Sequence, residues 1–418
     1  MIKKNILFLV LLIFIVPISV SASATPMAKI GQKYYYNLEE AIINANSEDV
    51  VTLVSDVNLD NSLLINKDVN LNLNGNNIMA KEKVFQVKGG FLNIVGKGII
   101  KETEPYYGAI MLIGSSDYTD EKYSVVRVGK DVVLEGWSGI FINHESSKSY
   151  GVVAYLDGKI NAVDDIDDGL GIGIYVNGNI KDKKGSPIVN ISDTAQINST
   201  GTGLYIAGYS TFNIGKSYIS GVESGISMKS GILNIDGTTV ICTGKDNTPT
   251  SGYNNGIKPS GAAIQIESNN GYAGKMQIDI SNGNFTSMNS HVIYEYIGKG
   301  DNSLIYSMSI SNGSFISKSL KDVFSFSESF KDIHSGFISG GKYSSNPNTY
   351  LKSGYTVVAD EDSFSVVKST LKTVFFNDYS NNNYFIKKLI NLLFLIGLTI
   401  YIFFNRKKIK NILVKLKR

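Results

Sequence analysis

Met276–Ser290 reads MQIDISNGNFTSMNS, and two later segments repeat its pattern: Tyr306–Ser319 (YSMSISNGSFISKS) and, more loosely, His334–Asn346 (HSGFISGGKYSSN). Each copy has a short run of alternating apolar and polar residues, a turn that contains glycine, and a second alternating run. Alternation with period two buries one face of a β-strand and exposes the other. A unit of two or three short strands cannot bury its inner face alone, so the repeat predicts β-coils stacked into a solenoid.

The same pattern extends toward the N-terminus with three strands per coil. First strands are expected to begin near Val84, Ala109, Gly139, Gly173, Gly203, Gly225, Ala263, Val292 and Val323. Second strands are typified by Phe91, Thr211 and Ile232, and third strands by Gly98–Glu102, Gln196–Ser199 and Thr239–Cys242. A strand that recurs every 22 to 38 residues must run parallel to its predecessor, which predicts a parallel β-helix of about nine or more coils.

Inward-facing positions of the first strands are expected to stack into apolar columns. They are Ile140, Ile142, Ile174, Val176, Leu204, Ile206, Ile226 and Met228. Each fully buried side chain of this kind stabilises the fold by about 1.5–3 kcal/mol. Because Cys242 is the only cysteine, stability has to come from this core and not from an internal disulfide.

Residues 1–24 have the composition of a secretory signal peptide. Lys3 and Lys4 precede an apolar run at 6–16, and small residues fill Ser19–Ala24. This order predicts export and cleavage after Ala24. A retained membrane anchor is the alternative.

Leu389–Phe404 (LINLLFLIGLTIYIFF) has sixteen residues and no charge. As a helix it covers about 24 Å, slightly less than the hydrocarbon core of about 30 Å. The basic residues of 405–418 favour a cytoplasmic tail, so the sequence predicts a single-pass protein of the cell membrane with its N-terminal part outside. A buried C-terminal helix is the alternative, and 377–388 is expected to be a linker.

The net charge of the exported part differs from that of the whole chain. Eleven of the 40 lysines and arginines lie in the two terminal segments, so 29 remain against 37 acids and the net charge is −8. An acidic surface excludes a nucleic-acid-binding protein and repels acidic polysaccharides unless a divalent cation intervenes. The scarcity of Arg beside abundant Asn, Lys, Ile and Tyr points to an AT-rich bacterial genome.

Three segments are expected to complete the exported part. In 25–50, Asn37 and Glu40 form a capping-box pattern for a short amphipathic helix that would cover the open end of the solenoid at 51–346. In 347–376, Tyr355–Val367 predicts a closing hairpin around Asp360–Asp362.

Two long segments carry a resemblance to a known family. Lys33–Ile78 (KYYYNLEEAIINANSEDVVTLVSDVNLDNSLLINKDVNLNLNGNNI) resembles the opening module of secreted bacterial right-handed β-helix proteins, the pectin-lyase-like group. Phe337–Val367 (FISGGKYSSNPNTYLKSGYTVVADEDSFSVV) resembles the closing unit of such surface proteins. The resemblance covers most of Lys29–Lys368, and because its motifs are structural it implies a fold and no particular activity.

Asp164, Asp165, Asp167 and Asp168 form an acidic loop with the oxygen ligands that Ca²⁺ requires, although their spacing differs from that of an EF-hand. A solvated acidic turn is the alternative. The Asp pair also suggests a polysaccharide lyase or glycoside hydrolase. The other motifs of polygalacturonase-like enzymes are missing, and Arg127, the only arginine of the exported part, is expected to point outward.

Four tyrosines mark a candidate ligand-binding edge. The loops after the first strands are longer than turns require, and stacking would align them along one edge with Tyr118, Tyr123, Tyr150 and Tyr272. Exposed aromatic faces beside polar groups suit sugars or protein partners. We therefore expect a membrane-anchored cell-surface protein of a Gram-positive-type bacterium that acts without catalysis, as an adhesion, binding or structural module. A lyase or hydrolase is the alternative.

Overall fold

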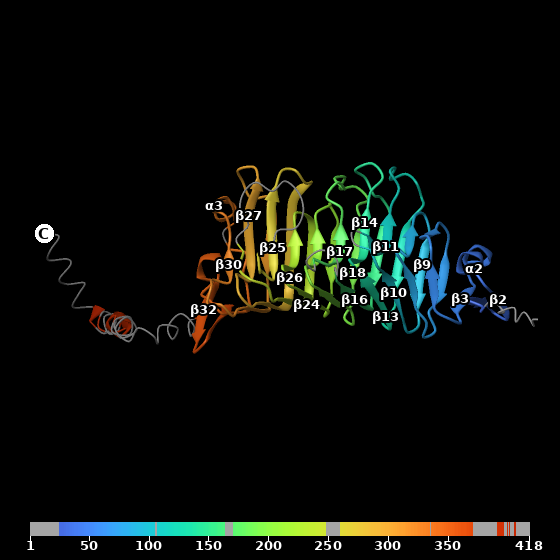
Figure 1. Cartoon of the computed structure of the whole chain (residues 1–418). Helices are drawn as coiled ribbons and strands as arrows, with labels where there is room; N and C mark the ends of the chain where they lie inside the picture. The colour runs from blue at the N-terminus through green and yellow to red at the C-terminus, as the bar shows by residue number, and fades with distance from the viewer. Residues whose placement is uncertain are drawn as a thin grey trace, which may run out of the picture.

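The computed structural model describes residues 25–104, 107–163, 170–247, 260–334, 336–370, 391–396, 399, 401, 405 and 406. The structure is all-β, with parallel strands stacked in sequence order into an elongated solenoid, as the repeat predicts (Figure 1). Strand pairing forms three columns, which correspond to the first, second and third strands of each coil.

The first column is a ten-stranded parallel sheet. Its strands are β5 (Leu63–Ile65), β8 (Phe85–Val87), β11 (Gly108–Ile113), β14 (Ser138–Asn143), β17 (Ile172–Val176), β20 (Thr202–Ile206), β23 (Ser224–Met228), β25 (Ile264–Asn269), β27 (Ile293–Lys299) and β30 (Phe324–Ser325). All nine predicted starts lie within two residues of a strand of this sheet, so the predicted positions are confirmed.

The second and third columns belong to one larger sheet. The second contains β3 (Val50–Leu53), β6 (Val69–Asn72), β9 (Phe91–Val95), β12 (Ser124–Val128), β15 (Val152–Leu156), β18 (Ile188–Ile191), β21 (Thr211–Ile214) and β28 (Ile305–Ile310). The third contains β4 (Val57–Leu59), β7 (Ile78–Ala80), β10 (Gly98–Glu102), β13 (Val132–Gly136), β16 (Lys159–Ala162), β19 (Gln196–Ser199), β22 (Tyr218–Gly221), β29 (Ser314–Ser317) and β31 (Lys342–Tyr343).

Two long strands join these columns where the sequence predicts a turn. β24 (Ser230–Cys242) and β26 (Gly274–Ser287) each supply both a second and a third strand, and their pairing shifts register around Asp236. Gly237 lies at this irregularity and has a φ of +96°. A glycine with positive φ lets a strand bend through a bulge without ending, which explains the difference.

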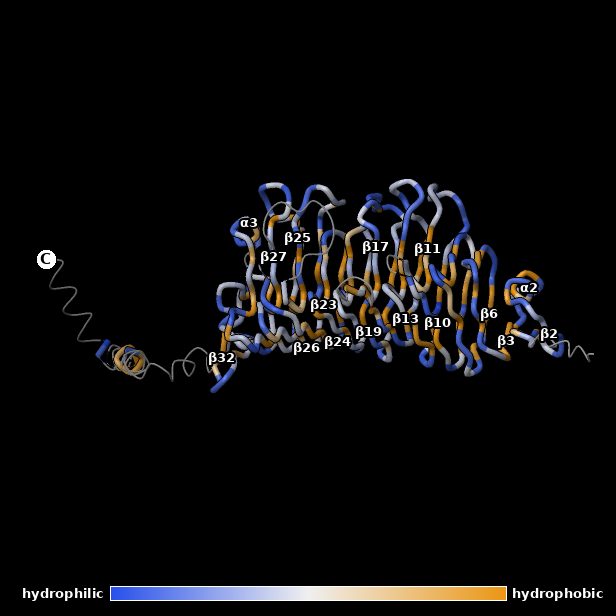
Figure 2. Tube along the Cα trace, in the orientation of Figure 1, coloured by the Kyte–Doolittle hydropathy of each residue, from blue (hydrophilic) through white to orange (hydrophobic). Residues whose placement is uncertain are grey.

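The core fills the interior of the stack. The eight predicted inward residues of the first column are all buried, and alternate strand residues face outward. Figure 2 shows hydrophobic residues along the strands and mostly hydrophilic ones on the loops above them. Toward the C-terminus the rings of Phe285, Phe315 and Tyr343 stack, with centroids 4.8 and 5.0 Å apart.

Both ends carry antiparallel or helical elements. β1 (Ala28–Ile30) pairs antiparallel with β2 (Lys33–Tyr35) and β3, and α2 (Leu38–Asn44) begins where predicted, with Asn37 Oδ1 accepting from the Glu40 N–H at 3.1 Å. At the other end lie α3 (Glu328–Ile333), the 3₁₀ turn η1 (Asn348–Tyr350) and the hairpin of β32 (Tyr355–Asp360) and β33 (Ser363–Lys368). The hairpin turns between Asp360 and Ser363, which confirms its predicted position.

The predicted signal peptide at 1–24 and linker at 377–388 lie outside the described residues. Of the predicted membrane span at 389–404, only 391–396, 399 and 401 are described. Within the described part of the chain, no helix has the length and hydropathy needed to cross a bilayer.

Candidate functional site

The outer face of the third column carries a row of polar side chains, one from each of five successive coils. Lys101, Glu135, Asn161, Asn198 and Ser220 are direct neighbours in the pairing of β10, β13, β16, β19 and β22. We call these five residues the third-strand row. They face outward because the residues beside them in each strand, Ile100, Leu134, Ile160, Ile197 and Ile219, are buried in the core.

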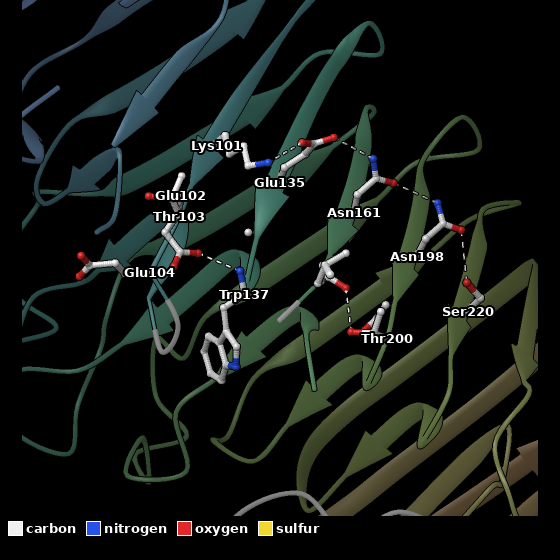
Figure 3. A pocket seen from close by; sticks show the side chains of 14 residues that line it. Lys101, Glu102, Thr103, Glu104, Glu135, Trp137, Asn161, Asn198, Thr200 and Ser220 are labelled. Atoms are coloured by element: carbon white, nitrogen blue, oxygen red, sulfur yellow. Dashed lines mark hydrogen bonds and ion pairs between the residues drawn. The ribbon is translucent and has the colours of Figure 1, made fainter. Parts of the chain in front are cut away.

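The third-strand row is connected by polar contacts from end to end (Figure 3). Lys101 Nζ lies 3.8 Å from Glu135 Oε2, and Asn161 Nδ2 donates to Glu135 Oε1 at 3.2 Å. Asn198 Nδ2 donates to Asn161 Oδ1 at 3.4 Å, and Ser220 Oγ donates to Asn198 Oδ1 at 3.2 Å. Each side chain therefore fixes the orientation of the next.

The third-strand row forms one side of a groove of about 670 Å³. The corner that follows the third strands forms the other side, with Thr103, Glu104, Trp137, Val163 and Thr200. Figure 3 shows Thr103, Glu104, Trp137 and Thr200 on the opposite side from the row. The groove therefore runs along the stack and not across it.

Trp137 is held at the groove by contacts on three sides. Its backbone N–H donates to Oε2 of the buried Glu102 at 2.9 Å. Its ring centroid lies 6.4 Å from that of Phe141 and 5.7 Å from that of Tyr175. A half-buried indole fixed in this way presents part of an aromatic surface at the edge of a polar groove.

A second polar row lies on the outer face of the second column. It consists of Tyr155, Asn190, Asn213, Asn234 and Asp279, which are neighbours in the pairing of successive coils. Asn213 Nδ2 donates to Asn190 Oδ1 at 3.0 Å, and Asn234 Nδ2 donates to Asn213 Oδ1 at 2.9 Å. These residues line a depression of about 480 Å³, and we call them the second-strand row.

Arg127 lies next to the second-strand row. It is exposed, as expected, and its guanidinium lies 4.7 Å from the centroid of the Tyr155 ring. Arg127 is thus a solvated strand residue with a cation–π contact. It lines neither the third-strand groove nor the depression at the second-strand row.

Three of the four predicted ligand-binding tyrosines come together at the loop edge. The rings of Tyr118 and Tyr150 lie 5.9 Å apart, and Tyr123 lies against the backbone of Gly151. Tyr118 and Tyr123 are exposed, at 51% and 58%. Tyr150 is buried, contrary to the expectation of an exposed face, because the loop that contains Asp182 and Gly185 packs against it. Its hydroxyl donates to Asp182, and this hydrogen bond raises the pKa of Tyr150 to about 12.

Tyr272, the fourth predicted tyrosine, lies over a buried ion pair. Lys229 Nζ is 4.9 Å from the centroid of its ring and pairs with the Glu267 carboxylate. Tyr205 packs on the same ammonium at 5.3 Å, and burial raises the pKa of its hydroxyl above the usual range. Tyr272 is thus half-buried and part of the packing of loop 270–275, apart from the Tyr118–Tyr150 contact.

The predicted calcium ligands Asp164, Asp165, Asp167 and Asp168 lie outside the described residues. Val163, which precedes them, lines the third-strand groove. Elsewhere in the described chain, no three His, Cys, Asp or Glu side chains are grouped so that they could hold a metal ion. His291 and His334 instead contact the carbonyls of Asp322 and Ile305.

The third-strand row was missed by the sequence analysis, although a signal for it was present. β10 and β19 were identified with their correct bounds, and their polar residues Lys101 and Asn198 occupy the same position beside a buried isoleucine. Aligning all third strands on that buried position, which holds isoleucine in four of them and Leu134 in β13, would have brought the five residues together.

Compared with protein-family models, curated proteins and solved structures, this chain gives no match. The geometry of the grooves and loops is therefore the basis for a functional assignment.

Proposed function

We propose that this chain is a non-enzymatic binding or structural module of a bacterial cell surface, which presents its strand faces and loop edges to glycan or protein partners. The observation that carries the proposal is the third-strand groove, with its hydrogen-bonded row of polar side chains across five coils.

The third-strand row supports binding because its side chains are already ordered. Asn161 and Asn198 stand on strands that are paired on both sides and are hydrogen-bonded to their neighbours within the row. Side chains that are already fixed lose little conformational entropy when a partner binds, so more of the contact energy appears as affinity.

A polysaccharide lyase or glycoside hydrolase is the second candidate. Glu104 and Glu135 line the same groove as Lys101, so it has two carboxylates besides the buried Glu102, together with a cation. Against this reading, Glu135 is engaged by Lys101 and Asn161, so it is positioned as part of the row and not aimed at a bond in a substrate. The non-enzymatic proposal is therefore preferred.

The proposal also includes the handedness of the coils, the role of α2 and the attachment to a membrane. A right-handed coil of the pectin-lyase-like type agrees with the handedness that parallel crossovers adopt almost without exception. α2 lies at the N-terminal end of the stack, where a helix would cover the first coil (Figure 1). A membrane span at 389–404 would place the solenoid close to the cell surface.

The test incubates the purified full chain with a panel of insoluble polysaccharides in the presence of Ca²⁺. Retention on a polysaccharide, with neither new reducing ends nor unsaturated products, is the expected result. Release of products by the parent, lost in Glu104→Gln and Glu135→Gln, would replace the proposal with an enzyme. Substituting Ala for Asp164, Asp165, Asp167 and Asp168 tests calcium: a thermal midpoint that Ca²⁺ raises in the parent and not in the variant would establish a site there.

A further inference from the structure

We propose that the third-strand groove binds an uncharged linear glycan whose chain runs along the solenoid axis, with Asn161 and Asn198 reading its hydroxyl groups. The inference rests on the proposed function, because it names the ligand class of the same groove.

The first argument is the hydrogen-bonding capacity that remains in the row. A side-chain amide has two N–H donors and two acceptor lone pairs. Asn161 uses one donor toward Glu135 and one lone pair toward Asn198, and Asn198 uses one donor toward Asn161 and one lone pair toward Ser220. Each amide therefore keeps one donor and one acceptor for a ligand. Groups that both donate and accept, as sugar hydroxyls do, match this pattern.

The second argument is charge. Among its described lining residues, the groove contains the carboxylates of Glu102, Glu104 and Glu135 against one ammonium, that of Lys101, which already lies beside Glu135. A polyanion such as a polyuronate would meet like charges without a cation to pair with it. Glu102 is buried and accepts from the Trp137 N–H, so among the described residues that line the groove Glu104 is the one carboxylate that a ligand would meet unpaired. This balance favours an uncharged ligand.

The third argument separates a glycan from an extended peptide. Peptides in extended conformation are commonly bound by adding a strand to a free sheet edge. The strands β13, β16 and β19, which carry the central residues of the third-strand row, are each paired on both sides. They therefore offer no free edge. The groove presents side-chain amides and hydroxyls instead, with one half-buried indole at its side.

The fourth argument is dimension. Neighbouring strands of a sheet lie about 4.8 Å apart, so the row from Lys101 to Ser220 extends for about 19 Å. That length accommodates several consecutive sugar rings. Trp137 lies in the same coil as Glu135, across the groove from it and near one end of the row, where its exposed surface provides an apolar platform for one ring.

The experiment measures binding of the purified full chain to cello- and chito-oligosaccharides, from disaccharide to octasaccharide, by isothermal titration calorimetry. Affinity is expected to rise with chain length and then level off once the row is filled. The double variant Asn161→Ala/Asn198→Ala is expected to lose at least tenfold in affinity, and Trp137→Phe several-fold.

The matched control is Asn190→Ala/Asn213→Ala in the second-strand row. It removes the same kind of amide–amide bond from the same solenoid, outside the groove. Its affinity is expected to stay within twofold of the parent, with circular dichroism confirming that both variants fold. Equal losses in the two variants would overturn the assignment to this groove.

Three further outcomes separate this inference from the proposed function. Binding of polygalacturonate or of an extended peptide library, without binding of the neutral oligosaccharides, would overturn the inference and leave a binding module. Cleavage of any oligosaccharide would refute the non-enzymatic function itself. Absence of binding by every oligosaccharide to the folded chain would overturn the inference directly.

Discussion

The buried pair of Lys229 and Glu267 gives the sharpest test of how buried charges contribute to the stability of the fold. Both side chains are almost completely inaccessible, at 0% and 1%, although Lys229 directly follows β23 and Glu267 lies in β25, each next to an inward-facing residue of its strand. The rings of Tyr205 and Tyr272 cover the ammonium, and Asn269 Nδ2 donates to the carboxylate at 2.6 Å. Removing one member therefore leaves the other charge buried.

The expected magnitudes follow from that burial. Glu267→Leu or Lys229→Met alone is expected to cost about 3–5 kcal/mol of unfolding free energy, because a buried charge loses its partner. The double variant Lys229→Met/Glu267→Leu removes both charges and regains apolar packing, which is often neutral or stabilising by about 1–4 kcal/mol. Asn269 then loses its acceptor, at a cost of about 1–3 kcal/mol. The unfolding free energy of the double variant should thus be close to that of the parent and well above that of either single variant.

The assay is urea unfolding, followed by circular dichroism and by the fluorescence of Trp137. Trp137 is the only tryptophan and packs in the same cluster as Tyr205 and Tyr272, so its emission reports on this face. A double variant as unstable as the singles would refute the reasoning. The control is Glu328→Gln, which breaks an exposed pair with Lys331 and should cost less than about 1 kcal/mol.

Three further predictions concern the core. Phe315→Ala should cost about 3–5 kcal/mol, because it empties the middle of the ring stack between Phe285 and Tyr343; urea unfolding measures it. Gly203→Ala should destabilise the fold enough to lower the thermal midpoint by several degrees, since its Cβ would lie 2.5 Å from the carbonyl oxygen of the next coil. Burial raises the pKa of Cys242 to about 11, so iodoacetamide at pH 8 should leave the native thiol unlabelled and modify it after unfolding.

Each of these has a control or a contradicting outcome. Phe315→Leu keeps most of the buried volume and should cost much less than the alanine variant. Gly271→Ala places its Cβ 3.0 Å from Asn269 Oδ1, which is a side-chain atom, so a loss equal to that of Gly203→Ala would argue against a backbone clash. Rapid labelling of Cys242 in the native protein would contradict its burial.

Local patterns predicted the elements well. The Asn37 cap and Glu40 lie within a few residues of each other, and α2 begins where they place it. The nine first strands were located because a buried apolar residue recurs at the same position in every coil. The fusion of second and third strands in β24 was not predicted, because Gly237 permits both a turn and a bulge.

The candidate sites were predicted less well. Tyr150 was expected to be exposed, but its burial depends on Asp182, which lies 32 residues away in the chain. The third-strand row joins residues separated by 22 to 37 positions, at intervals that vary with loop length. Such contacts depend on the stacking register of the coils.

The sequence by itself determined the repeat, the parallel strands and the apolar columns, because the alternation of apolar and polar residues is a local property of each strand. Only the tertiary structure decided which outward residues meet. It placed Lys101, Glu135, Asn161, Asn198 and Ser220 in one row and buried Lys229 with Glu267, because register between coils is set by packing of the whole stack.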